Sequence, residues 1–481
     1  MNTARWLLPL SISRLVSFQG RRWRLRGTMA LVVSLVAIAC SSPAQLPVAS
    51  EEEAANGDRA ANELTILWDK GYVLEEDEAI EKVVSDWEAK TGIEVTLSFY
   101  NSAEIAPKTL RSRQAGNPPD ILLSVKSAYP ISDWQGKLAD VSAVILPMRD
   151  RYSKDALASA KMFGTTVPEG EYYGVPINQS SMHVHYWRDL LATAGYTAAD
   201  IPTDWDGFWA FWQTVQSRLQ ATQNADIYGL GLPFSASAAD TYQIFEQVLR
   251  AYNVRLLDEA GQLQVEDPTV RQGIVDSLNW YVQFYRQKSV PPQAVNWLDS
   301  DNNRAFLNRE VVMTLNPTLS IPAAVRNDAE TYFNQLGTIE LPPKPDGTPL
   351  PHLVIVRKAI VFNDGPNQEA AKDFLAYLVQ PEVLNTFLKS SYGRFSPPID
   401  AIAQDPFWLN EQDPHVSTVN RTLVEGRVEV LENVRNPAYG VFLEENVWGE
   451  VLQRMAVENL SAEAGADIAI ARLQAIFAEW Q

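Results

Sequence analysis

Cysteine is almost absent from this 481-residue chain, which has Cys40 and no other. A disulfide needs two cysteines, so a disulfide-stapled scaffold is excluded. Histidine is scarce too: among the four, only His183 and His185 lie close together in sequence. They share one face of an expected strand, as two metal ligands would, but no further His or Cys clusters with them. We therefore expect no metal site and no cofactor.

Positive charge is in short supply beyond Cys40. Residues 1–40 hold six of the 40 basic residues and none of the acidic ones, which leaves 34 basic and 59 acidic residues and a net charge of −25. A chain this acidic is not expected to bind nucleic acid or to bind anionic lipid broadly by charge. The charge does not identify a ligand.

Motifs of nucleotide and hydrolase chemistry are also missing. Gly229-Leu230-Gly231 lacks a third glycine at the spacing of a dinucleotide loop, and neither a phosphate loop nor a Gly-x-Ser-x-Gly elbow occurs. The 59 acidic residues do not allow a catalytic carboxylate pair to be chosen from sequence.

No run after Cys40 is long and apolar enough to cross a membrane, but a shorter one precedes it. A basic stretch, residues 21–26, is followed by Met29–Ala39, apolar apart from Ser34. This pattern is typical of a secretory signal, and eleven residues are too few to span a bilayer, which takes about 20. The small residues before Cys40 resemble a bacterial lipobox. We expect residues 1–39 to be a signal peptide and residues 40–62 a tether lipidated at Cys40.

Two alternatives for this segment stay open. One is an ordinary cleaved signal with a cysteine nearby. The other is export in a folded state, because Arg21-Arg22 partly resembles a twin-arginine signal.

Strand and helix patterns alternate from residue 64 onward. Strands are expected at 64–68, 93–99 and 121–123, with helices at about 75–90 and 103–115 between them. Gly92 is expected to end the first helix. This alternation predicts a doubly wound parallel sheet.

The second half of the chain also contains both strand patterns and helix patterns. Strands are expected at 182–187, 311–315 and 353–362, and helices at about 268–287, at 366–378 and beyond Tyr439. Another helix is expected after Asp204, which is placed to cap it. Roughly 420 residues exceed a single core, so two domains are expected.

The order of these motifs resembles the extracellular solute-binding proteins of ABC importers, in the maltose-binding-like, sugar-binding group. The resemblance covers about residues 63–480 and rests on the following segments: Trp68-Asp69-Lys70-Gly71-Tyr72, residues 88–95, 116–121, 173–176, 186–191, 202–205, 304–316 and 371–375.

The resemblance implies two α/β lobes joined by a three-segment hinge, with a ligand cleft between them. It places lobe one at 63–178 plus 355–397 and lobe two at 180–352 plus 400–481. Ligand binding would close the lobes, and the closed protein would deliver a carbohydrate or polyol-like glycoside to the permease subunits. The expected protein is a monomer outside the cytoplasm, in the periplasm or at the cell surface, that performs no chemistry.

The resemblance also implies binding residues. The family lines its cleft with the loop after the first strand, and Trp offers a stacking face while carboxylates and amides bind hydroxyls. After the third strand the family's stacking tryptophan is missing here. The expected ligand-binding residues are Trp68, Asp69, Lys70, Ser124, Lys126, Asn178, Gln179, Ser180, Asp240, Tyr242, Asn316, Arg394 and Tyr439.

Three rival functions stay open. Convergence of the cationic side chains Lys70, Lys126, Arg357, Lys358 and Arg394 would favour an acidic sugar or a phosphate ester. Two carboxylates facing each other across one cleft, about 5–9.5 Å apart, would favour a glycan-acting enzyme. A sensor lipoprotein would present the ligand to a membrane receptor in place of a permease.

Overall fold

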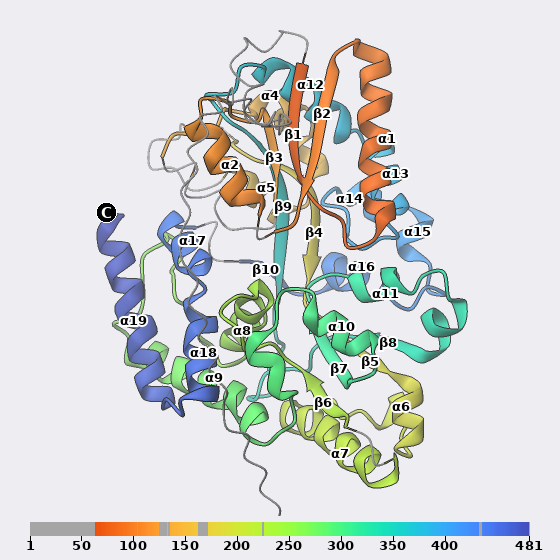
Figure 1. The fold of residues 1–481 in the computed structure, drawn as a ribbon, viewed down its shortest axis with the longest axis vertical. Coiled ribbons are helices and arrows are strands. Elements are labelled where there is room, and N and C mark those ends of the chain that lie inside the picture. The colour runs from red at the N-terminus through yellow and green to blue at the C-terminus, as the bar shows by residue number, and fades with distance from the viewer. Residues whose placement is uncertain are drawn as a thin grey trace, which may run out of the picture. The chain divides into compact units, whose positions relative to one another are not determined.

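The computed structural model describes residues 63–102, 104–124, 132, 135–161, 172–223, 226–431 and 435–480. In these ranges the chain builds two β-sheets covered by helices, which Figure 1 shows. The predicted signal peptide, Cys40, the tether and Lys126 lie outside the described residues. None of the described helices combines the length and apolar character that a membrane crossing requires.

The first sheet has six strands, with the order β10-β9-β3-β1-β2 and β4 paired with β9. Their bounds are β1 Glu63–Asp69, β2 Glu94–Tyr100, β3 Ile121–Leu123, β4 Val175–Ser181, β9 His352–Val361 and β10 Val428–Val430. Strand β1 is parallel to β2 and β3, as the sequence predicts. However, β9 is antiparallel to β3 and to β4, so the sheet is mixed rather than parallel. The reason is that β9 follows β8 of the other sheet, with no crossover helix to return it in parallel.

The second sheet has the strand order β6-β7-β5-β8. Its strands are β5 His183–Trp187, β6 Tyr228–Gly231, β7 Val311–Asn316 and β8 Leu336–Ile339. Strand β5 is antiparallel to both β7 and β8, whereas β6 is parallel to β7. Strands β5 and β7 confirm the predicted strands; β6 and β8 were not predicted.

Helices cover both sheets (Figure 1). Up to residue 251 they are α1 Leu74–Thr91, α2 Ile105–Gln114, α4 Ser142–Ile145, α5 Lys154–Lys161, α6 Arg188–Thr193, α7 Trp205–Gln223 and α8 Ala239–Ala251. Up to residue 409 they are α9 Pro268–Arg286, α10 Asp301–Leu307, α11 Ser320–Ala324, α12 Gln368–Leu378, α13 Pro381–Ser390, α14 Asp400–Ala403 and α15 Pro406–Leu409. The last are α16 Val416–Glu425, α17 Pro437–Glu444, α18 Val447–Val457 and α19 Ala462–Glu479.

The predicted helix ends are confirmed where capping chemistry marked them. Gly92 follows α1 with φ 73°, a left-handed conformation that glycine adopts without strain, and its N–H donates to the Glu88 carbonyl at 2.8 Å. Before α7, the Asp204 carboxylate accepts the Gly207 N–H at 2.8 Å. Both helices bury the apolar face that the sequence period predicted.

Each sheet has its own apolar core. In the first, Ile66 of β1 packs with Trp87 of α1 and Phe374 of α12. In the second, Tyr186 of β5 and Trp212 of α7 pack with their ring centroids 5.7 Å apart. Two cores in one chain are what a two-lobe α/β protein requires.

The chain passes between the sheets at two described points. Strand β4 ends at Ser181 and β5 begins at His183, and β8 ends at Ile339 before β9 begins at His352. The predicted lobe boundaries stay a prediction. Because Ile402, Trp408 and Val416 pack in the first core and β10 belongs to the first sheet, we propose that lobe one extends past residue 400, to about Val430 at the end of β10.

Candidate functional site

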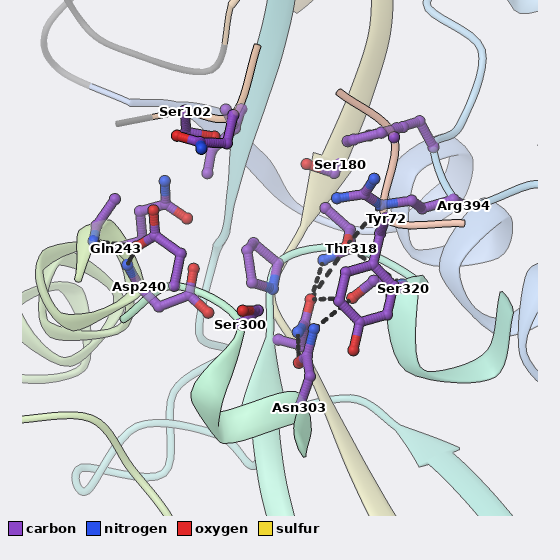
Figure 2. Close-up of a pocket in the computed structure, with 18 of the residues that line it drawn as sticks. Tyr72, Ser102, Ser180, Asp240, Gln243, Ser300, Asn303, Thr318, Ser320 and Arg394 are labelled. Atoms are coloured by element: carbon purple, nitrogen blue, oxygen red, sulfur yellow. Dashed lines mark hydrogen bonds between the residues drawn. The ribbon is translucent and has the colours of Figure 1, made fainter. Parts of the chain in front are cut away.

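A pocket of about 500 Å³ lies where segments of both sheets meet, and Figure 2 shows its lining. Its walls come from the loops after β1, β2 and β7, from β4 and β9, and from the N-terminal parts of α8 and α10. The ends of the strands place the loops there, as in open α/β sheets generally. The volume falls within the range of about 300–1,000 Å³ that is usual for small-molecule sites.

The loop after β1 is held by the acidic first turn of α1. The Gly71 N–H donates to Asp77 at 2.8 Å, and the Tyr72 N–H donates to Glu76 at 3.0 Å. A Cβ on Gly71 would stand 2.6 Å from the Glu76 Cβ, so only glycine fits this close approach. The loop thereby presents Lys70 and Tyr72 to the pocket.

Arg394 lines the pocket but is already paired. Its Nη1 lies 2.9 and 2.8 Å from the two carboxylate oxygens of Glu76, and its guanidinium lies 5.6 Å from the Tyr72 ring centroid. The Arg394 carbonyl accepts the Leu319 N–H at 3.0 Å, which ties this loop to the segment after β7. Arg394 therefore joins segments on two sides of the pocket.

Arg357 of β9 is the second guanidinium on the wall, and it too has a carboxylate partner. Its Nη2 lies 3.2 Å from Asp69 Oδ2, and both side chains are buried. The guanidinium also lies 4.6 Å from the Phe395 ring centroid. The pair neutralises Arg357 within the protein.

Amide and hydroxyl groups form a connected network below Tyr72 (Figure 2). The Asn316 amide donates to Asn303, whose own amide donates to Ser320 Oγ at 3.0 Å. The side-chain oxygen of Asn316, Oδ1, accepts from the Thr318 N–H at 2.8 Å and from the Thr318 hydroxyl at 3.1 Å. Burial raises the pKa of the Tyr72 hydroxyl, against the lowering effect of a hydrogen bond with Asn303. These groups are held in fixed orientations, as hydroxyl recognition requires.

Two carboxylates stand together on the α8 side. Asp299 Oδ1 accepts the N–H groups of Ala239, in a short contact, and of Asp240, at 3.4 Å. Asp240 Oδ2 accepts from the Asn302 amide at 3.1 Å. Burial first, and the nearby Asp299 charge second, raise the pKa of Asp240 well above its ordinary value. A cation that approaches Asp240 would lower this pKa again.

Five of the predicted binding residues line this pocket: Lys70, Ser180, Asp240, Asn316 and Arg394. Their role as ligand contacts remains a prediction. The sequence missed Tyr72, Gln243, Asp299, Asn303 and Ser320, which line it as well. Tyr72 closes the motif quoted for the first loop, but nothing in the sequence indicated that α8 would bring Gln243 to the same place.

Three predicted residues lie beside the pocket instead. Trp68, Asp69 and Asn178 line a neighbouring cavity of about 10 Å³, too small for a sugar. Trp68 is 4% exposed and its ring meets Phe387 edge-on, with centroids 6.2 Å apart. The structure thus places Trp68 in the core, because a strand end adjoining α13 buries it.

The other predicted residues that the structure describes are not on the lining of this pocket. The Gln179 side chain donates to the Pro397 carbonyl at 2.9 Å, linking two crossing segments. Tyr439 is buried in the second core, where its hydroxyl donates to Glu246, which also accepts from Trp448 Nε1 at 2.9 Å. Tyr242 and Ser124 are likewise buried.

The part of the chain that the structure describes offers no set of ligands for a metal ion. No group of three or more His, Cys, Asp or Glu side chains there is placed to hold an ion. His183 donates from Nδ1 to the Ser181 carbonyl at 2.9 Å, and His185 contacts the Thr338 hydroxyl at 2.9 Å.

Comparison with known families decides what kind of protein carries this pocket. The family model for the bacterial extracellular solute-binding protein matches residues 82–418, which is more than two thirds of the chain. The chain belongs to this family. The prediction of a solute-binding protein is thereby confirmed.

Curated relatives of this solute-binding protein match part of its length. A maltooligosaccharide ABC transporter solute-binding lipoprotein of Streptococcus pneumoniae is 27% identical over 172 residues, 36% of this chain and 37% of that protein. A putative binding protein of Brucella abortus is 22% identical over 249 residues, 52% of this chain and 56% of that protein. The chain therefore matches between about a third and a little over half of their lengths.

Solved structures share the fold of this solute-binding protein over most of its length. An ABC transporter solute-binding protein from Thermotoga lettingae, bound to α-D-tagatose, has a TM-score of 0.72 at 19% identity, covering 86% of this chain and 99% of its own. Maltose-bound MalE3 of T. maritima has a TM-score of 0.70, also at 19% identity and with the same coverage. The predicted two-lobe α/β fold of the maltose-binding-like type is confirmed.

Proposed function

We propose that this solute-binding protein is the ligand-capturing component of an ABC importer and that its ligand is a carbohydrate or polyol-like glycoside. The observation that carries the proposal is the pocket itself, where fixed amides and hydroxyls meet charged groups from both sheets. Sugar hydroxyls both donate and accept, so they need this mixture of partners. The names of the pneumococcal relatives and the sugar ligands of the structural neighbours support the same class.

The alternative of an acidic sugar or a phosphate ester as ligand has little support from the pocket. Of the cationic side chains that it requires, Arg357 and Arg394 are paired with carboxylates, and Lys358 is not on the lining of the pocket. Lys126 lies outside the described residues. Lys70 alone is left among the described candidates, which favours an uncharged or cationic ligand over an acidic one.

The enzyme alternative needs two carboxylates that face each other across the cleft. The pocket acids Asp240 and Asp299 instead adjoin on the α8 side, where Asp299 accepts the Asp240 N–H. We propose binding without turnover. Overnight incubation with each bound oligosaccharide should return it unchanged by chromatography, whereas release of shorter sugars would favour the enzyme.

Attachment and delivery complete the proposal. We propose that Cys40 carries a lipid, that the protein acts as a monomer outside the cytoplasm, and that its closed form docks on permease subunits. Metabolic labelling with an alkyne fatty acid should mark the full chain but not Cys40→Ser. Equal labelling of both would contradict the anchor.

A sugar and polyol panel tests the binding class. Titration calorimetry on the protein should find a ligand with a dissociation constant near 1 μM, equivalent to about −8 kcal/mol. At 100 times that constant, the ligand should add about 2.7 kcal/mol to the free energy of unfolding. Ser300 is exposed on the pocket wall, so Ser300→Trp should fill the space and weaken binding at least tenfold.

Ser217→Trp on the exposed face of α7 is the matched control. It adds the same ring far from the pocket lining and should bind normally. Absence of binding across the panel, or equal binding by both variants, would contradict the proposal.

A further inference from the structure

The cationic groups of the pocket are almost entirely neutralised from within. The Arg394 and Arg357 guanidinium groups face Glu76 and Asp69, at 2.8 and 3.2 Å. Lys70 is the exposed exception, at the lip formed by the loop after β1. A ligand anion would have to compete with carboxylates that are already in place and mostly buried.

The carboxylates on the α8 side are in the opposite situation. The Asp240 and Asp299 carboxylates accept hydrogen bonds from neutral donors, namely the Asn302 amide and the N–H groups of Ala239 and Asp240. Among the described residues, neither carboxylate forms an ion pair with Lys, Arg or His. Asp240 is 9% exposed and lines the pocket.

The two sides of the pocket therefore differ in charge. Figure 2 shows Asp240 and Gln243 on the α8 side, and Arg394 and Tyr72 on the opposite side. Asn303 and Asn316, which are hydrogen-bonded to each other, line the pocket as well. A polar ligand would meet ion-paired and neutral hydrogen-bonding groups on one side, and two carboxyl groups without an ion-pair partner among the described residues on the other.

We propose that the ligand carries a protonated amino group, as an amino sugar does, and that Asp240 and Asp299 bind this group. The inference rests on the proposed function and narrows its ligand class. An ammonium group donates three hydrogen bonds and would supply the positive charge that this side lacks. Gln243, on the same side, presents an amide that suits a neighbouring hydroxyl.

A neutral sugar is the competing explanation. A protonated Asp240 would donate a hydrogen bond to a sugar hydroxyl and need no cation, and burial favours that form. The two cases differ in their dependence on pH. An ammonium needs the ionised carboxylate, so its binding weakens as the pH falls through the pKa of Asp240, whereas hydroxyl binding by the protonated acid does not.

Matched pairs of sugars separate the two. Glucosamine, galactosamine and β-1,4-linked glucosamine disaccharide are titrated calorimetrically against their hydroxyl parents and N-acetylated forms, using the protein at pH 7. In the pair that binds, we expect the amine to bind at least tenfold more tightly than either neutral form. This preference should shrink as the pH is lowered or the salt concentration raised.

The decisive variant is Asp240→Asn, whose amide keeps the shape of the side chain and an oxygen for Asn302. It should lose at least tenfold affinity for the amine and less than threefold for the hydroxyl parent. Asp299→Asn, alone and combined with Asp240→Asn, tests the second carboxylate. Because Asp299 accepts N–H groups at the start of α8, thermal unfolding checks that these variants remain folded. Glu78→Gln, on the exposed face of α1, is the control for removing one negative charge.

Each result has a consequence. A hydroxyl parent that binds as tightly as its amine, or an amine preference that survives in Asp240→Asn, would overturn this inference and leave the proposed function standing. Failure of every sugar, charged or neutral, would contradict both. The titratable neighbours Asp299, Tyr281 and Arg394 interact with Asp240, so the pH series is compared between wild type and Asp240→Asn.

Discussion

The Arg394–Glu76 ion pair joins the loop after α13 to the first turn of α1. Glu76 also accepts the Tyr72 N–H, and Arg394 Nε lies 3.5 Å from the Thr318 hydroxyl. The side chains of the pair are 16% and 9% exposed, so folding removes both charges largely from water, which costs free energy. The sequence singled out Arg394 as a ligand contact but gave no sign of its partner Glu76, because charged residues are usually on the surface.

Arg394→Met should lower the free energy of unfolding by about 2–4 kcal/mol, because it leaves a largely buried carboxylate without its cation. Urea denaturation at pH 7 measures the change. Lys82→Met removes a pair that is exposed on α1, Lys82–Asp86, and should cost at most about 1 kcal/mol. Similar losses in the two variants would show that burial does not strengthen the Arg394 pair.

Strand β8 shows how one glycine lets two elements pack. Gly337 pairs with Tyr186 of β5, and a Cβ on Gly337 would stand 2.2 Å from two atoms of the tyrosine ring. The ring is 2% exposed and packs on Trp212, so it has little room to move. Strand β8 can pack here only because residue 337 has no side chain. Glycine is unfavourable within strands, so a sequence pattern does not favour a strand at this position.

Gly337→Ala should therefore destabilise the protein by about 1–3 kcal/mol through overpacking. Urea denaturation should also show that the cost is smaller in a Tyr186→Leu background, where the ring is gone. An alanine that is tolerated equally in both backgrounds would mean that β8 shifts to make room.

All four histidines of the molecule are buried around the crossing between the sheets. His183 and His352 stack with their centroids 6.0 Å apart, and the Thr338 hydroxyl lies 2.9 Å from His185 and 2.6 Å from His415. Burial lowers the pKa of His183 and of His415 to about 4 and lowers those of the other two. All four are neutral in the folded protein at pH 7.

Acid should therefore weaken the folded state. The unfolded chain takes up protons on these residues below about pH 6.5, whereas in the folded chain His183 and His415 resist protonation until about pH 4 and the other two also titrate below their ordinary range. Stability therefore falls as the pH drops below about 6.5. Each histidine adds up to about 1.4 kcal/mol per pH unit to the slope. Urea denaturation between pH 7 and 4.5 measures it.

His415→Gln keeps a donor for the Tyr332 carbonyl, which His415 Nε2 contacts at 2.7 Å, and removes the titration. The free energy of unfolding of this variant should change less steeply with pH, by up to about 1.4 kcal/mol per pH unit, which is the contribution of one proton. Acids with a raised pKa, such as Asp77 and Asp240, act in the opposite direction, so the comparison with wild type is the test. An unchanged slope would mean that His415 is not protonated on unfolding in this range.

The order of strands and helices was predictable wherever a local pattern specified it. The apolar period of α1, Gly92 after it and Asp204 before α7 each act over a few residues, and all three are confirmed. The acidic balance beyond Cys40 and the motifs that led to the solute-binding family are also properties of sequence alone.

Tertiary structure alone decided which polar residues meet. Gln243, Asn303 and Arg394 lie far apart in sequence, and only the packing of α8, α10 and the loop after α13 brings them to one pocket. The same packing buries Trp68 and Tyr439 in the cores, away from the lining. A residue type shows what a side chain can bind, but its exposure and partners depend on contacts with distant segments, which no local pattern encodes.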